Sequence, residues 1–177
     1  MDPIIPENFE NQQISVSSIP RVEEVEFEPL SPKQLVKSNI STSISLGLFL
    51  GIAGGIYYFF GEIYNGYFPL VITLLLLIFL WSYISNWQWL KRSGYAVRER
   101  DIIFKRGFLF EKTTVVPFNR IQHVSTQRGM LDKMLGLSTL EIFTAGGSGS
   151  DIAIPGLTPE LAASLKEALS ARITHHV

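Results

Sequence analysis

Two long uncharged stretches decide the fold of this chain: ISTSISLGLFLGIAGGIYYFF at Ile40–Phe60 and YFPLVITLLLLIFLWSYISNWQWL at Tyr67–Leu90. A helix needs about 20 mainly apolar residues to cross a bilayer, and each stretch is that long. Two core helices of a soluble domain are the alternative, but uncharged runs side by side would leave no solvated helix face. The sequence therefore predicts a hairpin of two transmembrane helices over residues 31–90.

Residues at the ends of the stretches support this assignment. Ser31 and Pro32 are residue types that begin helices, and Gln34 stands where a capping box needs it. Pro69 falls in the first turn of the second helix, where its missing N–H costs little. Tyrosines gather toward one end of the hairpin and tryptophans toward the other, as in interfacial aromatic belts: Tyr57, Tyr58, Tyr64, Tyr67, Trp81, Trp87 and Trp89.

Basic residues near the spans predict the orientation. Lys33 and Lys37 precede the first span and Lys91 and Arg92 follow the second, whereas the short loop between them carries only Glu62. The positive-inside rule then puts both termini in the cytoplasm. The first apolar run begins far into the chain behind an acidic segment, so no cleaved signal peptide is predicted.

Glycines recur every four residues on one face of the first helix, at Gly47, Gly51 and Gly55. Small residues at this spacing let another backbone approach closely. Packing against the second span of the same chain is the favoured interpretation of this candidate helix-packing face. Dimerisation through the same face is the alternative.

The first 30 residues form an acidic arm. Residues 1–39 hold seven acidic and three basic residues, and residues 1–29 contain four prolines and few apolar groups. Such a composition predicts a disordered or extended segment. The alternating piece VEEVEFE at 22–28 leaves open an added edge strand.

From residue 91 the hydrophobic pattern changes to period two, which predicts strands at 95–98, 102–105, 108–116, 120–127, 138–145 and 151–155. In RIQHVSTQ at 120–127, simple alternation puts Ile121 and Val124 on opposite faces. A helical turn closed by glycine fits 129–136. The last segment is an amphipathic helix capped by Thr158 and Pro159. Residues 91–177 therefore predict a bent antiparallel sheet or small barrel closed by a C-terminal helix.

The stretch TAGGSGSD at 144–151 raises the question of a phosphate-binding loop. Such loops lead from a strand into a helix, and the P-loop adds a lysine. This stretch leads into the apolar strand pattern DIAIPG, with no lysine before Lys166. A hairpin connection is the favoured interpretation.

The sequence shows no catalytic constellation. The chain has no cysteine, which excludes thiolate nucleophiles and disulfides. His123 has no spaced ligand partner and is expected as a half-buried strand histidine, and the carboxylates alternate with bases as on solvated faces. We therefore expect no enzyme, no cofactor and no metal site.

A basic surface is the remaining candidate for function. Residues 91–177 hold twelve basic and eight acidic residues, and four bases lie on or beside the first predicted hairpin: Arg98, Arg100, Lys105 and Arg106. Near an anionic leaflet each such base contributes about 1 kcal/mol. Topological signalling and solubility are the alternative explanation. Nucleic acid is disfavoured because acids are interleaved with the bases and no reading helix is evident.

Three consecutive pieces, PFNRIQHV, LDKMLGL and TLEIFTAGG, follow the two spans. With the spans, they resemble the bacterial pleckstrin-homology-like membrane proteins of the YdbS type over about residues 30–173. The resemblance implies two nearly orthogonal antiparallel sheets capped by a C-terminal helix, at a bacterial plasma membrane. It does not imply an enzyme, because the family has no assigned catalytic residues.

Two functional hypotheses follow. The favoured one is a non-enzymatic, membrane-anchored interaction or scaffold module whose cytoplasmic domain at 91–177 binds a protein partner or its own copies. The alternative is recognition of anionic lipid head groups by the hairpin at Arg98–Arg106. The expected partners are thus membrane lipids and a protein or a second copy, and not nucleic acid.

Overall fold

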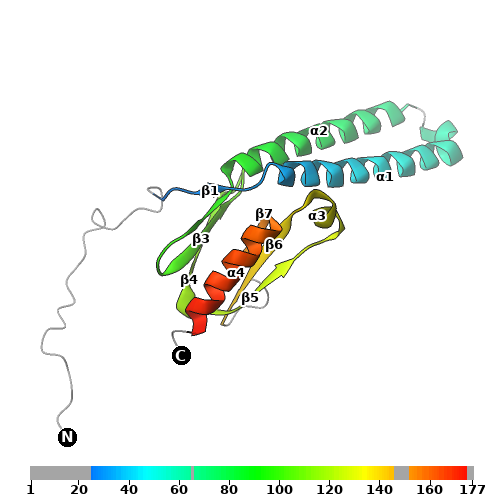
Figure 1. Cartoon of the computed structure of the whole chain (residues 1–177). Coiled ribbons are helices and arrows are strands. Elements are labelled where there is room, and N and C mark those ends of the chain that lie inside the picture. Colours follow the sequence, from blue (N-terminus) through cyan, green and yellow to red (C-terminus); the bar gives the residue numbers. More distant parts are fainter. Residues whose placement is uncertain (1–24, 65, 146–151, 175–177) are drawn as a thin grey trace, which may run out of the picture.

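The computed structural model describes residues 25–64, 66–145 and 152–174, without the side chains of 62–64 and 173–174. Two long helices, α1 (Lys33–Tyr64) and α2 (Phe68–Arg92), form a hairpin that extends away from a folded domain (Figure 1). They have 32 and 25 residues. At about 1.5 Å per residue each is longer than the hydrocarbon core of about 30 Å. The predicted helical hairpin is confirmed.

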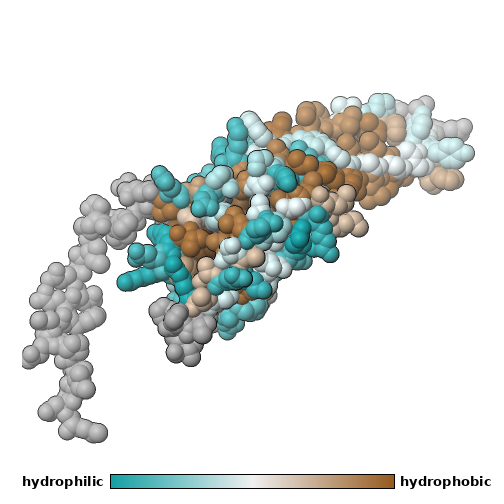
Figure 2. Space-filling view, viewed as in Figure 1, coloured by the Kyte–Doolittle hydropathy of each residue, from teal (hydrophilic) through white to brown (hydrophobic). Residues whose placement is uncertain are grey.

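Apolar side chains cover the outside of the hairpin. The exposed fractions of the surface of Leu48, Phe59 and Leu70 are 64%, 77% and 69%. In Figure 2 hydrophobic residues cover most of the hairpin, and hydrophilic residues gather over the domain. An apolar surface of this extent is typical of contact with lipid. Both helices are long and apolar enough to cross a membrane.

The two helices contact each other through a polar seam near the domain and aromatic pairs beyond it. In the polar seam, Asn86 Nδ2 donates hydrogen bonds to Asn39 Oδ1 at 3.3 Å and Thr42 Oγ1 at 3.1 Å. Ser43 Oγ and Tyr83 Oη lie 2.7 Å apart. The polar groups near the membrane boundary thus satisfy one another, which low-dielectric surroundings require.

The domain consists of two antiparallel sheets and a final helix. The first sheet has the order β1 (Glu28–Pro29), β2 (Gly94–Val97), β3 (Asp101–Arg106) and β4 (Lys112–Pro117). After the short helix η3 (Phe118–Arg120), the second sheet has the order β5 (Ile121–Gln127), β6 (Ser138–Thr144) and β7 (Ile152–Leu157), with α3 (Met130–Leu135) between β5 and β6. Helix α4 (Pro159–Thr174) packs against β5 and β6. The predicted architecture of antiparallel sheets closed by a C-terminal helix is confirmed.

One core joins both sheets and α4. Its side chains come from alternate strand positions and from one face of the helix, and include Ile102, Phe104, Leu140, Ile142, Ile154 and Leu169. Trp89 and Leu90, at the end of α2, pack against this core. The hairpin is therefore joined to the domain by apolar packing as well as by the chain itself.

The hairpin is inserted between the first two strands of the domain. Glu28 pairs with Tyr95 and Pro29 with Gly94 in an antiparallel ladder. Leu30 is 4% exposed and belongs to the core. The expectation of a disordered arm up to residue 30 is wrong for its last residues, because pairing with β2 and burial of Leu30 place them in the domain. Residues 1–24 lie outside the described part of the chain.

The start of α1 docks onto β7. Ser31 N donates to the Gly156 carbonyl at 3.0 Å, and Gln34 is buried against the same glycine. Gly156 has a φ of +72°, and a Cβ there would lie 2.9 Å from the Gln34 Cβ. Gln34 was expected to complete a capping box, but its side chain is used to pack α1 on the sheet.

Several local predictions can be compared with the structure. Gly136 closes α3 in the left-handed conformation, and Thr158 Oγ1 accepts a hydrogen bond from Leu161 N at 3.3 Å, as expected. The predicted alternation in β5 is wrong, because a register shift between Ile121 and His123 brings both Ile121 and Val124 into the core. Residues 146–151, the predicted hairpin connection, lie outside the described residues, but the flanking strands β6 and β7 pair antiparallel.

Candidate functional site

The four bases predicted as one surface lie at opposite ends of β3. Arg98 and Arg100 belong to the turn between β2 and β3, whereas Lys105 lies opposite Gly94, just after α2, and Arg106 follows it. At about 3.3 Å per residue the two ends of β3 are roughly 17 Å apart. The four bases therefore do not form one compact cluster, and their role as a lipid or partner surface stays a prediction.

Arg98 is engaged inside the domain. Its Nε and Nη2 donate to the two carboxylate oxygens of Asp101, each at 2.6 Å, and these hydrogen bonds raise the pKa of Arg98 above its ordinary value. The carbonyls of Arg98 and Glu99 accept hydrogen bonds from Arg172 of α4 at 3.2 and 2.7 Å. This end of the hairpin thus fastens α4 to the first sheet.

The other end of β3 lies at the junction with the membrane helices. Glu111 Oε2 is 3.4 Å from Lys105 Nζ, and its Oε1 is 3.6 Å from Arg92 Nη1. All three side chains are more than a third exposed, so these ion pairs add little stability. Glu111 nevertheless offsets part of the charge of Arg92 and Lys105.

A groove of about 470 Å³ opens between α2 and the connection from β3 to β4. Its walls are Ser85, Asn86 and Trp89 on α2, Arg106 at the end of β3, Gly107, Phe108, Leu109 and Phe110 on the connection, and Lys112 at the start of β4. In the described residues, neither Arg106 nor Lys112 forms an ion pair. Two available cations beside the Ser85 hydroxyl are chemistry that binds a phosphate group, whereas both donors of the Asn86 amide are used within the hairpin.

Sequence reasoning found Arg106 but missed the polar residues that α2 contributes to the groove. Ser85 and Asn86 were interpreted only as part of an uncharged span, and Lys112 is six residues beyond Arg106. A usable signal was the polar end of the second span, where Ser82, Ser85 and Asn86 interrupt the apolar run. Which strand connection lies beside that end is decided by the tertiary fold.

The connection between β3 and β4 is held tightly against α2. Gly107 has a φ of +122°, and a Cβ on it would lie 1.9 Å from the Phe110 carbonyl oxygen, so only glycine fits. The Phe108 ring is 6.3 Å from the Trp81 ring, centre to centre, and the Phe108 carbonyl accepts a hydrogen bond from Arg92 Nη1 at 3.4 Å. The connection therefore follows α2 away from the core.

The glycine face of α1 does not contact α2. A Cβ on Gly47, Gly51 or Gly55 would meet nothing within 4 Å. The helices contact each other through other positions, such as the pair Phe49 and Phe79. At about 100° per residue, the three glycines point roughly opposite to that contact face. Packing of this face against the second span is therefore wrong, and its use by another helix stays a prediction.

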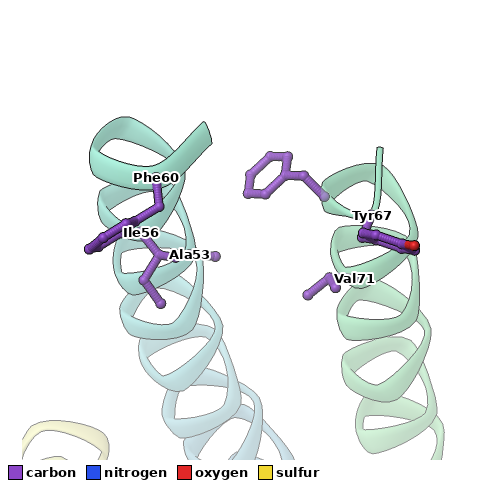
Figure 3. Close-up of a pocket in the computed structure, with 6 residues that line it drawn as sticks. Ala53, Ile56, Phe60, Tyr67 and Val71 are labelled. Atoms are coloured by element: carbon purple, nitrogen blue, oxygen red, sulfur yellow. The ribbon is translucent and has the colours of Figure 1, made fainter. Parts of the chain in front are cut away.

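A second hollow, of about 480 Å³, separates the helices near the hairpin loop. Figure 3 shows residues of its apolar lining, with Ala53, Ile56 and Phe60 on α1 and Tyr67 and Val71 on α2. Among the residues that the structure describes, no charged side chain lines this hollow. In a bilayer such a gap is filled by acyl chains, so it offers no polar chemistry.

His123 differs from its expectation. It is exposed instead of half-buried, and its ring stacks on Phe143 with centres 4.1 Å apart. The register shift in β5 turns this side chain outward. Over the described ranges, no group of three or more His, Cys, Asp or Glu residues is placed to hold a metal ion.

Comparison with known proteins gives two matches. Residues 43–173 match the family model described as "Bacterial PH domain". The chain is also similar to the UPF0699 transmembrane protein YdbS of Bacillus subtilis (strain 168), with 38% identity over 82 residues, which are 45% of this chain and 50% of that protein. The chain thus spans about half the length of the curated relative it matches. No solved structure matches it.

Proposed function

The chain belongs to the bacterial PH domain family, and on that premise we propose that it is a non-enzymatic, membrane-anchored module that binds anionic lipid head groups. The observation that carries the proposal is the groove in which Arg106 and Lys112 lie beside Ser85 and Asn86 of a transmembrane helix. A phosphate group in this groove would meet two cations and the Ser85 hydroxyl at the level where phospholipid head groups lie.

The position of the groove favours a lipid over a soluble anion. Its α2 wall lies within two turns of Lys91 and Arg92, the basic residues at the domain end of the helix. By the positive-inside rule, the basic residues on both sides of the hairpin favour a cytoplasmic position for the domain, and this position is part of the proposal. Anionic lipids are concentrated in that leaflet, and attraction to it amounts to about 1 kcal/mol per base.

The test is retention of lipid by the full-length protein. Purified in mild detergent with equal amounts of phosphatidylglycerol and phosphatidylcholine, the protein should retain phosphatidylglycerol in native mass spectra. The double variant Arg106→Gln, Lys112→Gln removes two cations, which at about 1 kcal/mol each should weaken retention about thirtyfold.

Arg98→Gln with Arg100→Gln is the matched control, because it removes the same charge from the far end of β3. Retention should survive this change. Equal retention of the two lipids, or equal losses in the two double variants, would show that the groove does not select anionic head groups.

A second candidate function is self-association in the membrane. It is supported by the open face at Gly47, Gly51 and Gly55, which α2 leaves uncovered. Close approach of a helix from another copy would bury this face. Gly51→Ile should then lower the oligomer fraction in detergent, whereas Leu77→Phe on the lipid-facing side of α2 should not. A monomeric wild-type protein would end this idea.

A protein partner at the domain remains a further prediction. Strands β4, β5 and β7 each have one neighbour in their sheets, and strand edges are common docking sites for extended peptides. A stoichiometric companion recovered with the full-length chain in mild detergent would support it. Nucleic acid is not proposed, because acidic residues such as Glu111 and Asp101 accompany the bases.

A further inference from the structure

The residues Phe108, Leu109 and Phe110, here called the apolar tip, form the connection between β3 and β4. Leu109 is 66% exposed and Phe110 is 89% exposed. Two large apolar side chains at the end of one tight turn are unusual on a surface that faces water. They are nevertheless held in place, because Gly107 and Phe108 fix the turn against α2.

The level of the bilayer surface can be located along α2. From Phe68 to Trp81 the helix carries one polar side chain that could face lipid, Thr73, and its hydroxyl donates to the Pro69 carbonyl at 2.8 Å. From Ser82 onward polar residues predominate. Tryptophan and tyrosine favour the membrane interface, so the interfacial region of α2 lies between Trp81 and Trp89.

The opposite helix gives the same level. Ser43 of α1 contacts Tyr83 at 2.7 Å, and polar side chains predominate in α1 before it and apolar ones after it. The two helices therefore change from polar to apolar at the same height. This agreement places the boundary independently of the aromatic residues.

The apolar tip reaches that boundary. Trp89 packs against the domain core, and Trp81, which contacts Phe108, is eight residues earlier on the same helix. Eight residues correspond to roughly 12 Å along the axis. Because Phe108 also contacts Arg92, the tip lies along the part of α2 between Trp81 and Arg92.

The charges around the tip match a membrane surface. Arg106 and Lys112 flank it in the chain, and Arg92 contacts Phe108 with its guanidinium 5.3 Å from the ring. Apolar side chains bordered by bases are typical of segments that lie in the interface of a bilayer. A protein partner bound over the tip would need acidic residues to neutralise these bases.

We propose that the apolar tip inserts Leu109 and Phe110 into the lipid interface and is a second membrane anchor that fixes the orientation of the domain. The occupant is the bilayer of the same membrane. This proposal depends on the placement of the hairpin in the membrane and not on head-group selection, because apolar insertion needs no anionic lipid.

The test uses the absence of native cysteine in the chain. Single variants Phe110→Cys, Leu109→Cys and Val97→Cys carry a nitroxide spin label in full-length protein in nanodiscs of phosphatidylcholine alone. Val97 is 44% exposed at the far end of β2 and serves as the control. Labels at 109 and 110 should collide with oxygen and lose collision with a water-soluble nickel complex, and the label at 97 should do the opposite.

An unlabelled variant separates insertion from an effect of the label. Leu109→Asp with Phe110→Asp should increase hydrogen exchange at residues 107–111 in nanodiscs and leave the core strands protected, whereas Val97→Asp should not. Labels at 109 and 110 that meet the nickel complex as freely as the one at 97 would overturn the proposal. Labels shielded from both oxygen and the nickel complex would also overturn the proposal, because such shielding means that protein covers the tip. Because the nanodiscs contain only neutral lipid, insertion of the tip can be detected even if the groove does not select anionic head groups.

Discussion

Lys37 Nζ of the first membrane helix lies 2.6 Å from Asp132 Oδ1 in α3, with side-chain exposures of 26% and 8%. The other carboxylate oxygen of Asp132 accepts a hydrogen bond from Gly129 N at 3.0 Å, which closes the start of α3. One carboxylate therefore both caps a domain helix and binds α1. This ion pair, the docking of Ser31 on Gly156 and the packing of Trp89 on the core attach the domain to both membrane helices.

Lys37→Gln should loosen this attachment. Removing the ammonium leaves the buried Asp132 carboxylate short of a partner, a loss of about 1–3 kcal/mol. Hydrogen exchange of the α3 amides should accelerate, while exchange in β6 stays slow. Lys33→Gln, one turn earlier and exposed, is the control and should leave α3 unchanged. An α3 that is equally protected in both variants would mean that the ion pair is energetically silent.

Tyr95 should make the domain sensitive to alkaline pH. The side chain is 2% exposed and its hydroxyl donates to Glu28 at 2.5 Å, and burial first and this hydrogen bond second raise its pKa above the ordinary value of about 10. A raised folded-state pKa gives stability that is complete below pH 10 and is lost as the pH rises toward the folded-state value, at about 1.4 kcal/mol per pH unit.

The guanidinium chloride concentration at which the domain is half unfolded measures this loss of stability. It can be followed by tryptophan fluorescence between pH 8 and roughly pH 11. Tyr95→Phe should flatten the profile above pH 10 and release β1 to faster hydrogen exchange at neutral pH. A profile identical to that of the wild type would exclude Tyr95 as the titrating group.

Gly156→Ala should weaken the docking of α1 on β7. The left-handed backbone at φ +72° costs a residue with a Cβ about 1–2 kcal/mol, and the added atom meets the Gln34 Cβ at 2.9 Å. The thermal midpoint of the domain should fall. Gly47→Ala is the matched control, since its Cβ has open space in a helix and should stabilise slightly. Equal thermal midpoints in the two variants would show that the sheet adapts to the added Cβ without losing stability.

Asn86→Leu should loosen the membrane hairpin at its domain end. It removes the donors to Asn39 and Thr42, and hydrogen bonds between membrane helices average about 0.6 kcal/mol. In pulsed electron paramagnetic resonance, the distribution of distances between spin labels placed near residues 39 and 86 on the two helices should broaden. Asn39→Leu should act in the same way, and a narrow distribution in both variants would contradict the role of the polar seam.

Much of the fold follows from one-dimensional pattern. Runs of uncharged residues at 40–60 and 67–90 are long enough to cross a bilayer, and no other environment accepts so wide an apolar surface. The Gly136 and Thr158 caps are equally local, because each depends on the backbone within a few residues. Period-two segments marked the strands for the same reason.

The errors share the opposite origin. The bulge that turns His123 outward, the pairing of Glu28 with Tyr95 and the burial of Leu30 depend on residues far away in the chain. The acidic arm has too few apolar groups to fold by itself, and its last residues become ordered only because β2 offers a free edge and the core a place for one leucine.

By itself, the sequence determined that this chain has a membrane hairpin and a strand-rich domain ending in a helix, since hydropathy and periodicity are local properties. Only the tertiary structure decided that the basic residues of β3 separate, that Arg106 and Lys112 meet Ser85 beside α2, and that the apolar tip reaches Trp81. These relations depend on strand direction and on the docking of both hairpin ends to one core, and no local pattern carries that information.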